Sequence, residues 1–272
     1  MTIVITGAGS GGHVTPLLAV ANDLKKLDPT VKVIFIGQIG DPFGQRLEIS
    51  DFIDQSIYIS AGKFRRYHGA GFSQLLDFST ILKNIVDFFR FLIGTIQAYF
   101  ILLEIKPNII FIKGGYIGVP VGLAAAARGI KYITHDSDTM PGLANRIIAK
   151  WALNHATGMP KELYSYPQNK IIYVGVPISN KYKKLSAADV ADYKESLGID
   201  KNKQVILFAG GGLGSLTLNK ALLAIVDSLL ENNSNLVLLN IAGKDHEADY
   251  NLQYDKKLKG EKRKRVIVKG FV

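Results

Sequence analysis

The residues of this chain whose types and spacing could do chemistry begin with a glycine cluster that ends in a histidine. Residues 7–16 read GAGSGGHVTP, between an apolar strand-like run and a helical pattern. Glycines at such a junction let backbone N–H groups crowd around an anion, and the first turn of the helix adds positive potential. The cluster predicts a diphosphate site, and the alternative is a tight turn that binds nothing.

His13 follows these glycines where the loop becomes a helix, so its side chain could project into a cleft. A neutral imidazole there could accept a proton from a hydroxyl nucleophile, because the positive end of the helix disfavours the charged form. A purely structural histidine is the alternative. The position beside the glycine loop favours a catalytic base.

Two further glycine loops follow strand-like runs. Gly114 and Gly115 come after NIIFIK, and residues 210–214 read GGGLG after QVILFA. Neither the first cluster nor residues 210–214 continue with Gly-Lys-Ser/Thr, which argues against a P-loop, and no convincing acidic residue closes the second strand to bind a ribose. The glycine loops therefore favour phosphate binding of a kind other than NAD binding.

A polar segment after another strand could orient the hydroxyl groups of a sugar. Residues 134–146 read THDSDTMPGLANR and supply His135, Asp136, Asp138 and Asn145. The alternative is helix capping by Asp138 or Ser137. His135 and the neighbouring acids could bind a metal, but nothing in the spacing requires one. No Ser-His-Asp arrangement for nucleophilic catalysis is recognisable.

The elements that must position these residues alternate along the chain. Strands are expected at 3–6, 31–37, 56–59, 108–113, 130–134 and 171–174, and helices at 16–27, 119–128 and 143–151. Strands that are separated by crossover helices form a parallel sheet covered on both faces. The pattern then restarts with QVILFA and its glycine loop, and NLVLLNIAG and RVIVKGFV supply two more strands.

This repetition predicts an α/β fold with two Rossmann-like, doubly wound domains. We place the boundary near Pro177, with residues 1–176 in the first domain and residues 177–272 in a second, incomplete domain. Ligands of such domains bind at the carboxyl ends of the strands, so the two domains are expected to enclose a cleft. The basic segment 256–265 is interpreted as a solvated connection, with contact to anionic lipid as the alternative.

The stretch 75–103 is unusually apolar and reads as a long helix. One face of its helical projection carries Leu75, Phe78, Leu82, Ile85, Phe89, Leu92, Ile96, Tyr99 and Leu103. Internal charges such as Lys83 and Asp87 argue against a membrane span. The helix either covers the sheet or dips its apolar face into a bilayer interface. A basic and aromatic cluster upstream suits anionic headgroups, and its members are Lys63, Phe64, Arg65, Arg66 and Tyr67.

Bulk composition narrows the class of protein. The chain has 272 residues, of which 47% are hydrophobic, and no cysteine, which fits a globular protein of a reducing compartment. Its formal net charge of +10 suits nucleic acid, an anionic membrane or a phosphorylated substrate. Nucleic acid would explain only the charge, so we do not expect it as a partner. Since the chain opens directly on a strand-like run, we expect no secretory signal.

Taken together, these residues resemble the MurG glycosyltransferases of peptidoglycan synthesis. The similar segments are GAGSGGHVTPLLAVA, AGKFRRY, KPNIIFIKGGYIGVPVGLAA, HDSDTMPGLANRIIAK, VGVPI and GGGLGSLTLN, which occur in the family's order. The resemblance implies a GT-B type fold and an inverting transfer without an obligatory metal or other cofactor. N-acetylglucosamine would pass from UDP-GlcNAc to the C4 hydroxyl of undecaprenyl-diphospho-N-acetylmuramoyl-pentapeptide.

The same resemblance implies roles for individual residues, with His13 as the base that deprotonates the accepting hydroxyl. In the first domain, the residues expected to bind the lipid-linked diphosphate acceptor are Ser10, Gly11, Gly12, Gly114, Gly115, Tyr116, His135, Asp138 and Asn145. In the second, those expected to bind UDP-GlcNAc are Gly211, Gly212, Leu213, Gly214, Ser215 and Val272. The apolar helix and the basic cluster would hold a peripheral protein on the cytoplasmic, anionic leaflet of the cell membrane.

The chain departs from the family's pattern near the expected diphosphate sites. Asp136-Ser137-Asp138 replaces an acid-glutamine-asparagine run, Gly212-Leu213 replaces a polar pair, and Ser179, itself a candidate substrate-binding residue, falls where an arginine is common. Losing a cation and gaining an acid should weaken donor binding. A non-catalytic or split membrane-associated subunit that binds the acceptor and needs a separate donor-binding chain is therefore the alternative. A nicotinamide-dependent dehydrogenase would explain only one glycine loop.

Overall fold

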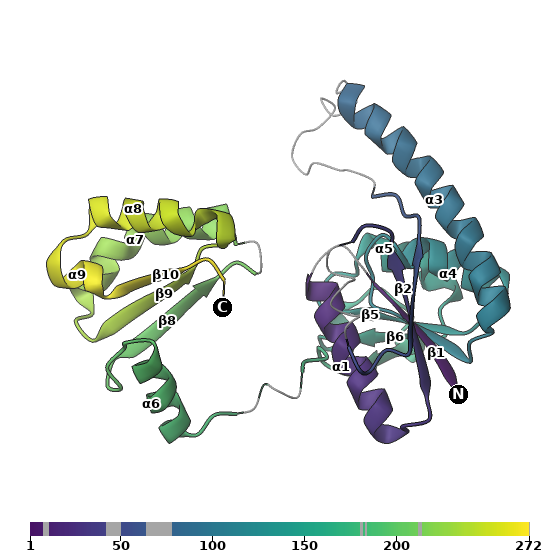
Figure 1. The fold of residues 1–272 in the computed structure, drawn as a ribbon, viewed down its shortest axis with the longest axis horizontal. Coiled ribbons are helices and arrows are strands. Elements are labelled where there is room, and N and C mark those ends of the chain that lie inside the picture. Colours follow the sequence, from purple (N-terminus) through teal and green to yellow (C-terminus); the bar gives the residue numbers. More distant parts are fainter. Residues whose placement is uncertain are drawn as a thin grey trace. The chain divides into compact units, whose positions relative to one another are not determined.

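The structure, a computed structural model, describes residues 1–7, 11–41, 50–63, 78–179, 182, 184–211 and 214–271. The chain divides into two compact units, Met1–Tyr182 and Lys183–Val272. This division falls a few residues after the boundary predicted near Pro177. Each unit has its own parallel sheet and its own buried core (Figure 1).

The first unit is built on a seven-stranded parallel sheet with the order β3-β2-β1-β4-β5-β6-β7. The strands are β1 Thr2–Thr6, β2 Lys32–Gln38, β3 Gln55–Ile59, β4 Ile109–Ile112, β5 Tyr132–Asp136, β6 Asn154–Thr157 and β7 Ile171–Tyr173. The strand order reverses between β1 and β4, which confirms the predicted doubly wound class. Strand β6 is an addition to the predicted strands, because its residues NHAT form neither an apolar run nor an apolar alternation.

Helices connect the strands of the first unit. They are α1 Gly11–Leu27, α3 Phe78–Ile105, α4 Gly118–Ala127 and α5 Leu143–Ile148, and a short 3-10 turn at Ala149–Trp151 follows α5. Helix α1 begins at Gly11, earlier than the predicted start near Pro16, and Pro16 lies inside it. Glycine is a poor helix former, so the sequence pattern misses this first turn. As a result His13 is a helical residue next to the carboxyl end of β1.

Alternate residues of the central strands face opposite sides of the sheet, because side chains alternate along a strand. Val4 of β1 belongs to the core that includes Leu102 of α3 and Val121 of α4. Ile5 of the same strand belongs to the core that includes Leu17 of α1. Both faces of the sheet are therefore covered, which explains why β1 and β2 read as nearly continuous apolar runs.

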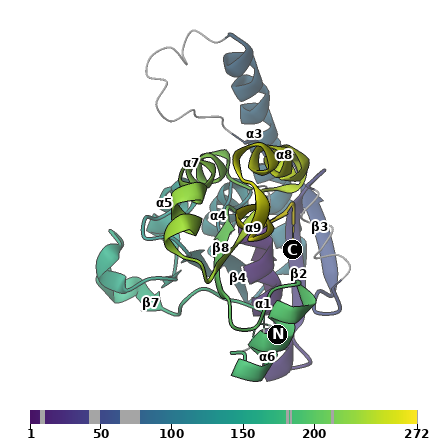
Figure 2. The same ribbon diagram turned by 90° about the vertical axis from the view of Figure 1, so that its left-hand side faces the viewer.

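Helix α3 packs through small residues and leaves its broad apolar face exposed. Gly94 and Ala98 are buried, and a Cβ atom on Gly94 would lie 1.9 Å from the carbonyl oxygen of Ser60. By contrast, the side chains of Phe89 and Ile96 are 58% and 59% exposed. The helix therefore does cover part of the sheet, but through residues such as Ala98 and Leu102 and not through the predicted apolar face. The amino-terminal half of α3 extends past the sheet (Figure 1 and Figure 2).

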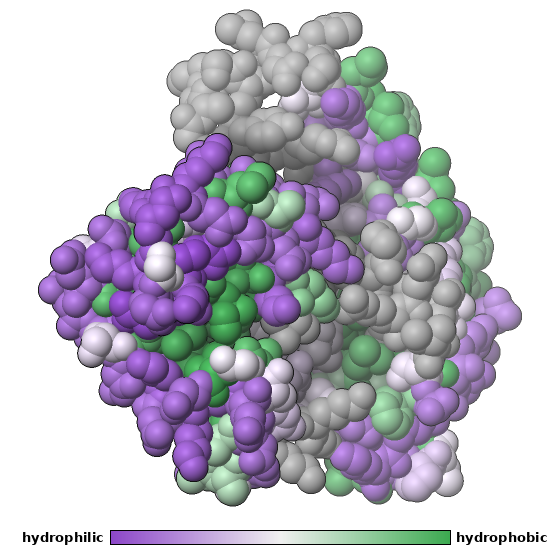
Figure 3. Space-filling view, turned by 60° about the vertical axis from the view of Figure 1, so that its left-hand side comes forward, coloured by the Kyte–Doolittle hydropathy of each residue, from purple (hydrophilic) through white to green (hydrophobic). Residues whose placement is uncertain are grey.

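The exposed face of α3 forms an extended apolar surface. Its residues more than a third exposed include Ile81, Leu82, Ile85, Val86, Phe88, Phe89, Leu92, Ile93, Ile96, Tyr99, Phe100 and Leu103. Apolar side chains follow the upper right edge of the space-filling view, at the height of α3 (Figure 3). By length and composition, Thr80–Ile105 is a helix of the described residues that could cross a membrane. Exposed apolar patches of this extent mark interaction surfaces.

The second unit has a three-stranded parallel sheet with the order β10-β9-β8. The strands are β8 Gln204–Ala209, β9 Leu236–Ile241 and β10 Val266–Lys269, and the helices are α6 Ala187–Ser196, α7 Leu216–Asn232, α8 Glu247–Lys257 and α9 Gly260–Lys264. Leu222 of α7 and Tyr254 of α8 share a core with Leu238 of β9. The strand, glycine loop and helix order of the first unit is thus repeated.

The basic segment 256–265 has more structure than the predicted solvated connection. It contains the end of α8 and all of α9. Lys262 pairs with Asp227 of α7 at 2.8 Å, and Arg263 pairs with Asp255 of α8 at 2.5 Å. The segment is therefore part of the second unit.

Candidate active site

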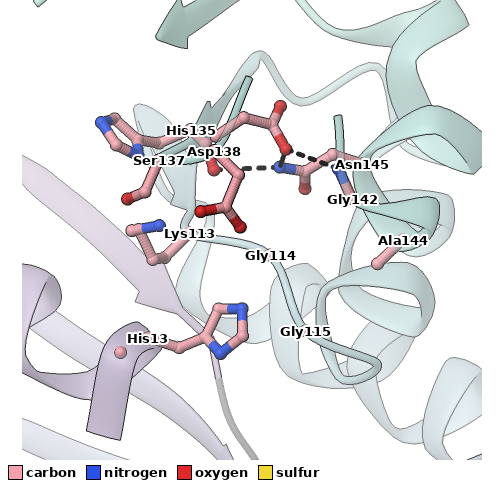
Figure 4. A pocket seen from close by; sticks show the side chains of 12 residues that line it. His13, Lys113, Gly114, Gly115, His135, Ser137, Asp138, Gly142, Ala144 and Asn145 are labelled. Carbon is pink, nitrogen blue, oxygen red and sulfur yellow. Dashed lines mark hydrogen bonds between the residues drawn. The ribbon is translucent and has the colours of Figure 1, made fainter. Parts of the chain in front are cut away.

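A polar pocket of about 260 Å³ lies at the carboxyl ends of β1, β4 and β5 in the first unit (Figure 4). Its lining residues are Gly12, His13, Lys113, Gly114, Gly115, His135, Asp136, Ser137, Asp138, Gly142, Ala144 and Asn145. They come from the start of α1, the loop after β4 and the segment between β5 and α5. Parallel sheets bind ligands at this edge, where the strand order reverses.

His13 lies in the first turn of α1, and its imidazole points into the pocket (Figure 4). Burial lowers its pKa below 6.5, and the charge of Lys113 lowers it further, while Asp138 and Asp136 act in the opposite direction. The imidazole is therefore mainly neutral at pH 7. A neutral imidazole beside a cavity is suited to accept a proton from a bound hydroxyl.

Lys113 follows the last residue of β4 and is only 4% exposed. Burial lowers the pKa of its ammonium from 10.5, whereas Asp136 and Asp138 raise it. Among the described residues, this ammonium has no hydrogen-bond or ion-pair partner at bonding distance. A buried cation that faces a cavity is a candidate ligand for an anion, because pairing with an anion offsets the cost of its burial.

Asp136, at the end of β5, ties the wall of the pocket together. Its Oδ1 atom accepts hydrogen bonds from the backbone N–H of Gly142 at 2.9 Å and from Nδ2 of Asn145 at 3.0 Å. Its Oδ2 atom accepts one from the hydroxyl of Tyr166 at 2.9 Å. Burial and the charge of Asp136 raise the pKa of that hydroxyl. The start of α5 is thereby fixed against the sheet.

The loop after β4 turns through two glycines in the left-handed region. The φ angles of Gly114 and Gly115 are +105° and +81°, and residues with a Cβ atom rarely adopt such angles. The carbonyl of Gly115 accepts the N–H of Gly118 at 3.0 Å, at the start of α4. Tyr116 donates its hydroxyl to the amide oxygen of Gln38, and burial raises the pKa of this hydroxyl. Gly114 and Gly115 line the pocket, and their contact with the acceptor stays a prediction.

His135 and Asn145 support the pocket from within the unit. His135 is fully buried and its Nε2 atom lies 3.0 Å from the carbonyl oxygen of Gly175, to which it must donate. Burial lowers the pKa of this imidazole. Asn145 is also buried and donates both to Asp136 and to the carbonyl of His135 at 3.0 Å. These two residues therefore support the wall of the pocket, and because they also line it, their predicted contact with a sugar stays a prediction.

Asp138 and Ser179 occupy different places. Asp138 is exposed and its carboxylate reaches into the pocket between Lys113 and His13 (Figure 4). Its carbonyl accepts the hydroxyl of Tyr164 at 2.7 Å, which holds the loop. Ser179 follows β7 and is absent from the lining of the polar pocket. Asp138 therefore lines the same pocket as His13, whereas Ser179 does not.

Some predicted site residues lie outside the described residues. They are Ser10, Phe64, Arg65, Arg66, Tyr67, Gly212, Leu213 and Val272. Gly11 begins α1, and Lys63 is exposed. Within the described part of the chain, no group of three or more His, Asp or Glu side chains could hold a metal ion.

The second glycine loop lies between β8 and α7 in the second unit. The φ angles of Gly211 and Gly214 are +80° and +77°, and a Cβ atom on Gly214 would lie 2.0 Å from the carbonyl oxygen of Ala242. Ser215 caps α7, because its Oγ atom accepts the N–H of Leu218 at 3.3 Å. A glycine turn that leads into a capped helix N-terminus is suited to bind an anion.

Sequence reasoning did not single out Lys113, or Tyr166, whose hydroxyl donates to Asp136. Lys113 stands directly before Gly114. A cation beside a glycine loop is typical of an anion site, so the sequence did contain a signal for this residue. Tyr166 and His155 carried no such signal. Their rings stack with centroids 3.8 Å apart, and burial lowers the pKa of His155 to about 4.

The sequence of this chain is similar to those of known glycosyltransferases. Residues 3–157 match the glycosyltransferase family 28 N-terminal domain. A relative from Lachnospira eligens, named "UDP-N-acetylglucosamine--N-acetylmuramyl-(pentapeptide) pyrophosphoryl-undecaprenol N-acetylglucosamine transferase", is 35% identical over 233 residues. That alignment covers 85% of this chain and 60% of the relative. The chain thus spans about three fifths of the length of this relative.

Two solved structures share the fold. The crystal structure of Acinetobacter baumannii MurG gives a TM-score of 0.63 at 19% identity and covers 100% of this chain and 66% of its own. The crystal structure of Anabaena Alr3699/HepE in complex with UDP-glucose gives a TM-score of 0.61 at 12% identity and covers 100% of this chain and 69% of its own. These likenesses confirm the predicted GT-B type α/β fold.

Proposed function

Because the chain belongs to glycosyltransferase family 28, as its resemblance to the MurG enzymes predicted, we propose that it takes part in lipid-linked sugar transfer. N-acetylglucosamine passes from UDP-GlcNAc to the C4 hydroxyl of undecaprenyl-diphospho-N-acetylmuramoyl-pentapeptide. The name of the Lachnospira eligens relative supports this substrate pair. The observation that carries the proposal is the polar pocket, in which the imidazole of His13 and the buried ammonium of Lys113 line one cavity.

In this proposal His13 is the catalytic base. It takes the proton of the C4 hydroxyl as the oxygen attacks the anomeric carbon of N-acetylglucosamine. The bond from that carbon to the diphosphate breaks, UDP leaves with the electron pair, and attack from the opposite side inverts the anomeric configuration. The lowered pKa of His13 keeps the imidazole in the proton-accepting form at neutral pH. General base catalysis of this kind contributes about 10²- to 10⁴-fold in rate.

The acceptor diphosphate is assigned to the floor of the polar pocket. Lys113 supplies the positive charge, and the start of α1 at Gly11 and Gly12 supplies backbone donors and helix dipole. Gly114 and Gly115 allow close approach of the backbone. The sequence resemblance adds Ser10 and Tyr116 to this assignment. Asp138, which is exposed at the pocket, orients a hydroxyl of the acceptor sugar.

The donor is assigned to the second unit. Gly211, Gly214 and Ser215 form the glycine turn and the capped start of α7, which suit the UDP diphosphate. Gly212, Leu213 and Val272 complete this assignment from the sequence resemblance, as does Ser179. The Anabaena structure that shares the fold was solved with UDP-glucose, which supports a nucleotide-sugar ligand.

The protein is proposed to work as a peripheral protein on the cytoplasmic side of the cell membrane. The exposed apolar face of α3 supplies surface that can enter the headgroup and acyl boundary. Lys63 and the adjoining basic residues Arg65 and Arg66 supply attraction to anionic lipid. A surface of this kind brings the pocket to an acceptor whose lipid stays in the bilayer.

The test is transfer of radiolabelled N-acetylglucosamine from UDP-GlcNAc to the lipid-linked acceptor, measured with the wild type and with His13→Ala. The variant should lose about 10²- to 10⁴-fold in kcat while it still binds the acceptor. Thr15→Ala is the matched control, since Thr15 is exposed on the same helix and absent from the pocket lining. Full turnover by His13→Ala would remove this residue from the mechanism. Binding of the acceptor without any transfer would favour the acceptor-binding subunit.

A further inference from the structure

An apolar cavity of about 450 Å³ lies between α3, α4 and α5 of the first unit. Its apolar walls are Phe91 of α3, Val119 and Leu123 of α4, and Leu143 and Ile147 of α5. This size is within the range of small-ligand sites in proteins. No step of the proposed transfer reaction uses these five apolar side chains.

The cavity shares a wall with the polar pocket. His13, Gly115, Gly142 and Ala144 line both of them. The two pockets together form one site with two ends. Charged side chains and the backbone N–H groups at the start of α1 lie at one end, and aliphatic and aromatic side chains lie at the other. A ligand that fills both ends must carry an anionic or polar group directly next to an apolar group.

We propose that this cavity binds the first isoprenoid units of the acceptor's polyprenyl chain, next to the diphosphate in the polar pocket. This inference rests on the proposed function, in which the acceptor is a polyprenyl diphosphate. The relatives' names contain pyrophosphoryl-undecaprenol, in which the apolar chain is bonded directly to the diphosphate. The junction between diphosphate and hydrocarbon then falls at the shared wall of the two pockets.

The chemistry of the walls selects hydrocarbon over the other parts of such an acceptor. A sugar or a peptide buried against Val119, Leu123 and Ile147 would lose hydrogen bonds to water without replacement. An isoprenoid loses none and gains by leaving water. Lys63 is the ammonium on this lining, and it is exposed, so it can remain in water or meet an anionic headgroup.

The route out of the cavity supports the same occupant. Phe91 lines the cavity, and Phe88, which lies one helical turn before it on the same side of α3, is 47% exposed and belongs to the exposed apolar face. A chain that leaves the cavity past α3 thus continues along apolar surface. The remaining isoprenoid units could pass from there into a bilayer without crossing a polar surface.

The test compares soluble probes by isothermal titration calorimetry on the whole chain. Inorganic diphosphate reports on the polar pocket, and geranyl diphosphate adds two isoprenoid units. Each buried methylene favours binding by roughly fourfold, so geranyl diphosphate should bind at least about tenfold more tightly than inorganic diphosphate. Ile147→Phe and Val119→Phe fill the cavity, and both should abolish the advantage of the tail while inorganic diphosphate binds as before.

Ile96→Phe is the matched control, because Ile96 is exposed on α3 and lies outside the cavity lining. It should keep the full advantage of the tail. Equal binding of the two probes by the wild type, or a full advantage in both filled variants, would overturn the inference and leave the proposed transfer intact. If Ile96→Glu lost the tighter binding of geranyl diphosphate while Ile147→Phe kept it, the isoprenoid tail would be assigned to the surface of α3 instead of the cavity. Failure to bind inorganic diphosphate at all would count against the proposed acceptor site as well.

Discussion

At the scale of single residues, Lys113 links the stability of the first unit to the charge of its ligand. Its buried ammonium has no bonded partner in the described part of the chain, and such burial costs free energy in the unliganded protein. Lys113→Met removes that charge at similar volume, so thermal unfolding should occur at an equal or higher temperature. Diphosphate should bind about tenfold to a hundredfold more weakly, because hydrogen bonds to charged groups contribute about 1.5–3 kcal/mol. Calorimetric titration with inorganic diphosphate measures this loss, and unchanged affinity would exclude Lys113 from the site.

His13 should set the acid limb of the pH dependence of kcat/KM. Its pKa lies below 6.5 because of burial and the charge of Lys113, so activity should fall only as the pH drops below 6.5. Lys113→Met removes the neighbouring positive charge and should move this limb to higher pH. Asp138→Asn removes a negative charge and should move it to lower pH. A limb that stays in place in both variants would assign it to another group.

At the scale of elements, Asp136 joins β5, the start of α5 and the segment that contains Tyr166. The two carboxylate oxygens of Asp136 accept hydrogen bonds from three donors. Asp136→Asn keeps the shape of the side chain but replaces one of these oxygens by an NH₂ group, which cannot accept a hydrogen bond. The free energy of unfolding should fall by about 2–4 kcal/mol in urea titrations. Asp138→Asn is the control, since this carboxylate is exposed and should cost within about 0.5 kcal/mol. Equal stability of the two variants would contradict the supporting role of Asp136.

Gly94 determines how closely α3 approaches the segment after β3. Gly to Ala at an exposed position inside a helix stabilises by about 1 kcal/mol. Gly94→Ala should instead destabilise by about 2 kcal/mol or more, because the added Cβ atom would lie 1.9 Å from the carbonyl oxygen of Ser60. Chemical denaturation decides the sign. Ile96→Ala, on the exposed side of the same helix, should leave the stability nearly unchanged.

At the scale of the whole molecule, the exposed face of α3 is expected to determine membrane association. Phe89→Glu combined with Ile96→Glu places charge where burial in the interface would otherwise favour binding. Association with vesicles of anionic phospholipid should fall at least about tenfold in co-sedimentation. Thermal stability should be retained, because both side chains are more than half exposed. Undiminished association would assign the membrane contact to another surface.

The amino-acid sequence by itself determined the class of fold and the edge of the sheet at which the candidate site residues lie. Apolar runs followed by glycine loops and helical patterns predict parallel strands, and the carboxyl ends of parallel strands must share one edge of the sheet. That rule was enough to place His13, Gly114 and Asp138 near one another. It was not enough for β6, whose short polar sequence pairs as a strand only because β5 and β7 flank it.

Only the tertiary structure decided which side chains face the cavity and which surface stays open. Periodicity shows that Phe89 and Ile96 share a face of α3, but it does not show whether another element covers that face. Small residues such as Gly94 allow the closest approach, so they form the contact and leave the larger apolar side chains outside. Likewise, Lys113 becomes part of a site because the fold buries it beside His13, and the hydrogen bonds of Asp136 join residues that are far apart in the chain. Burial and long-range contacts of this kind depend on the packing of the whole unit, whereas local patterns depend only on neighbouring residues.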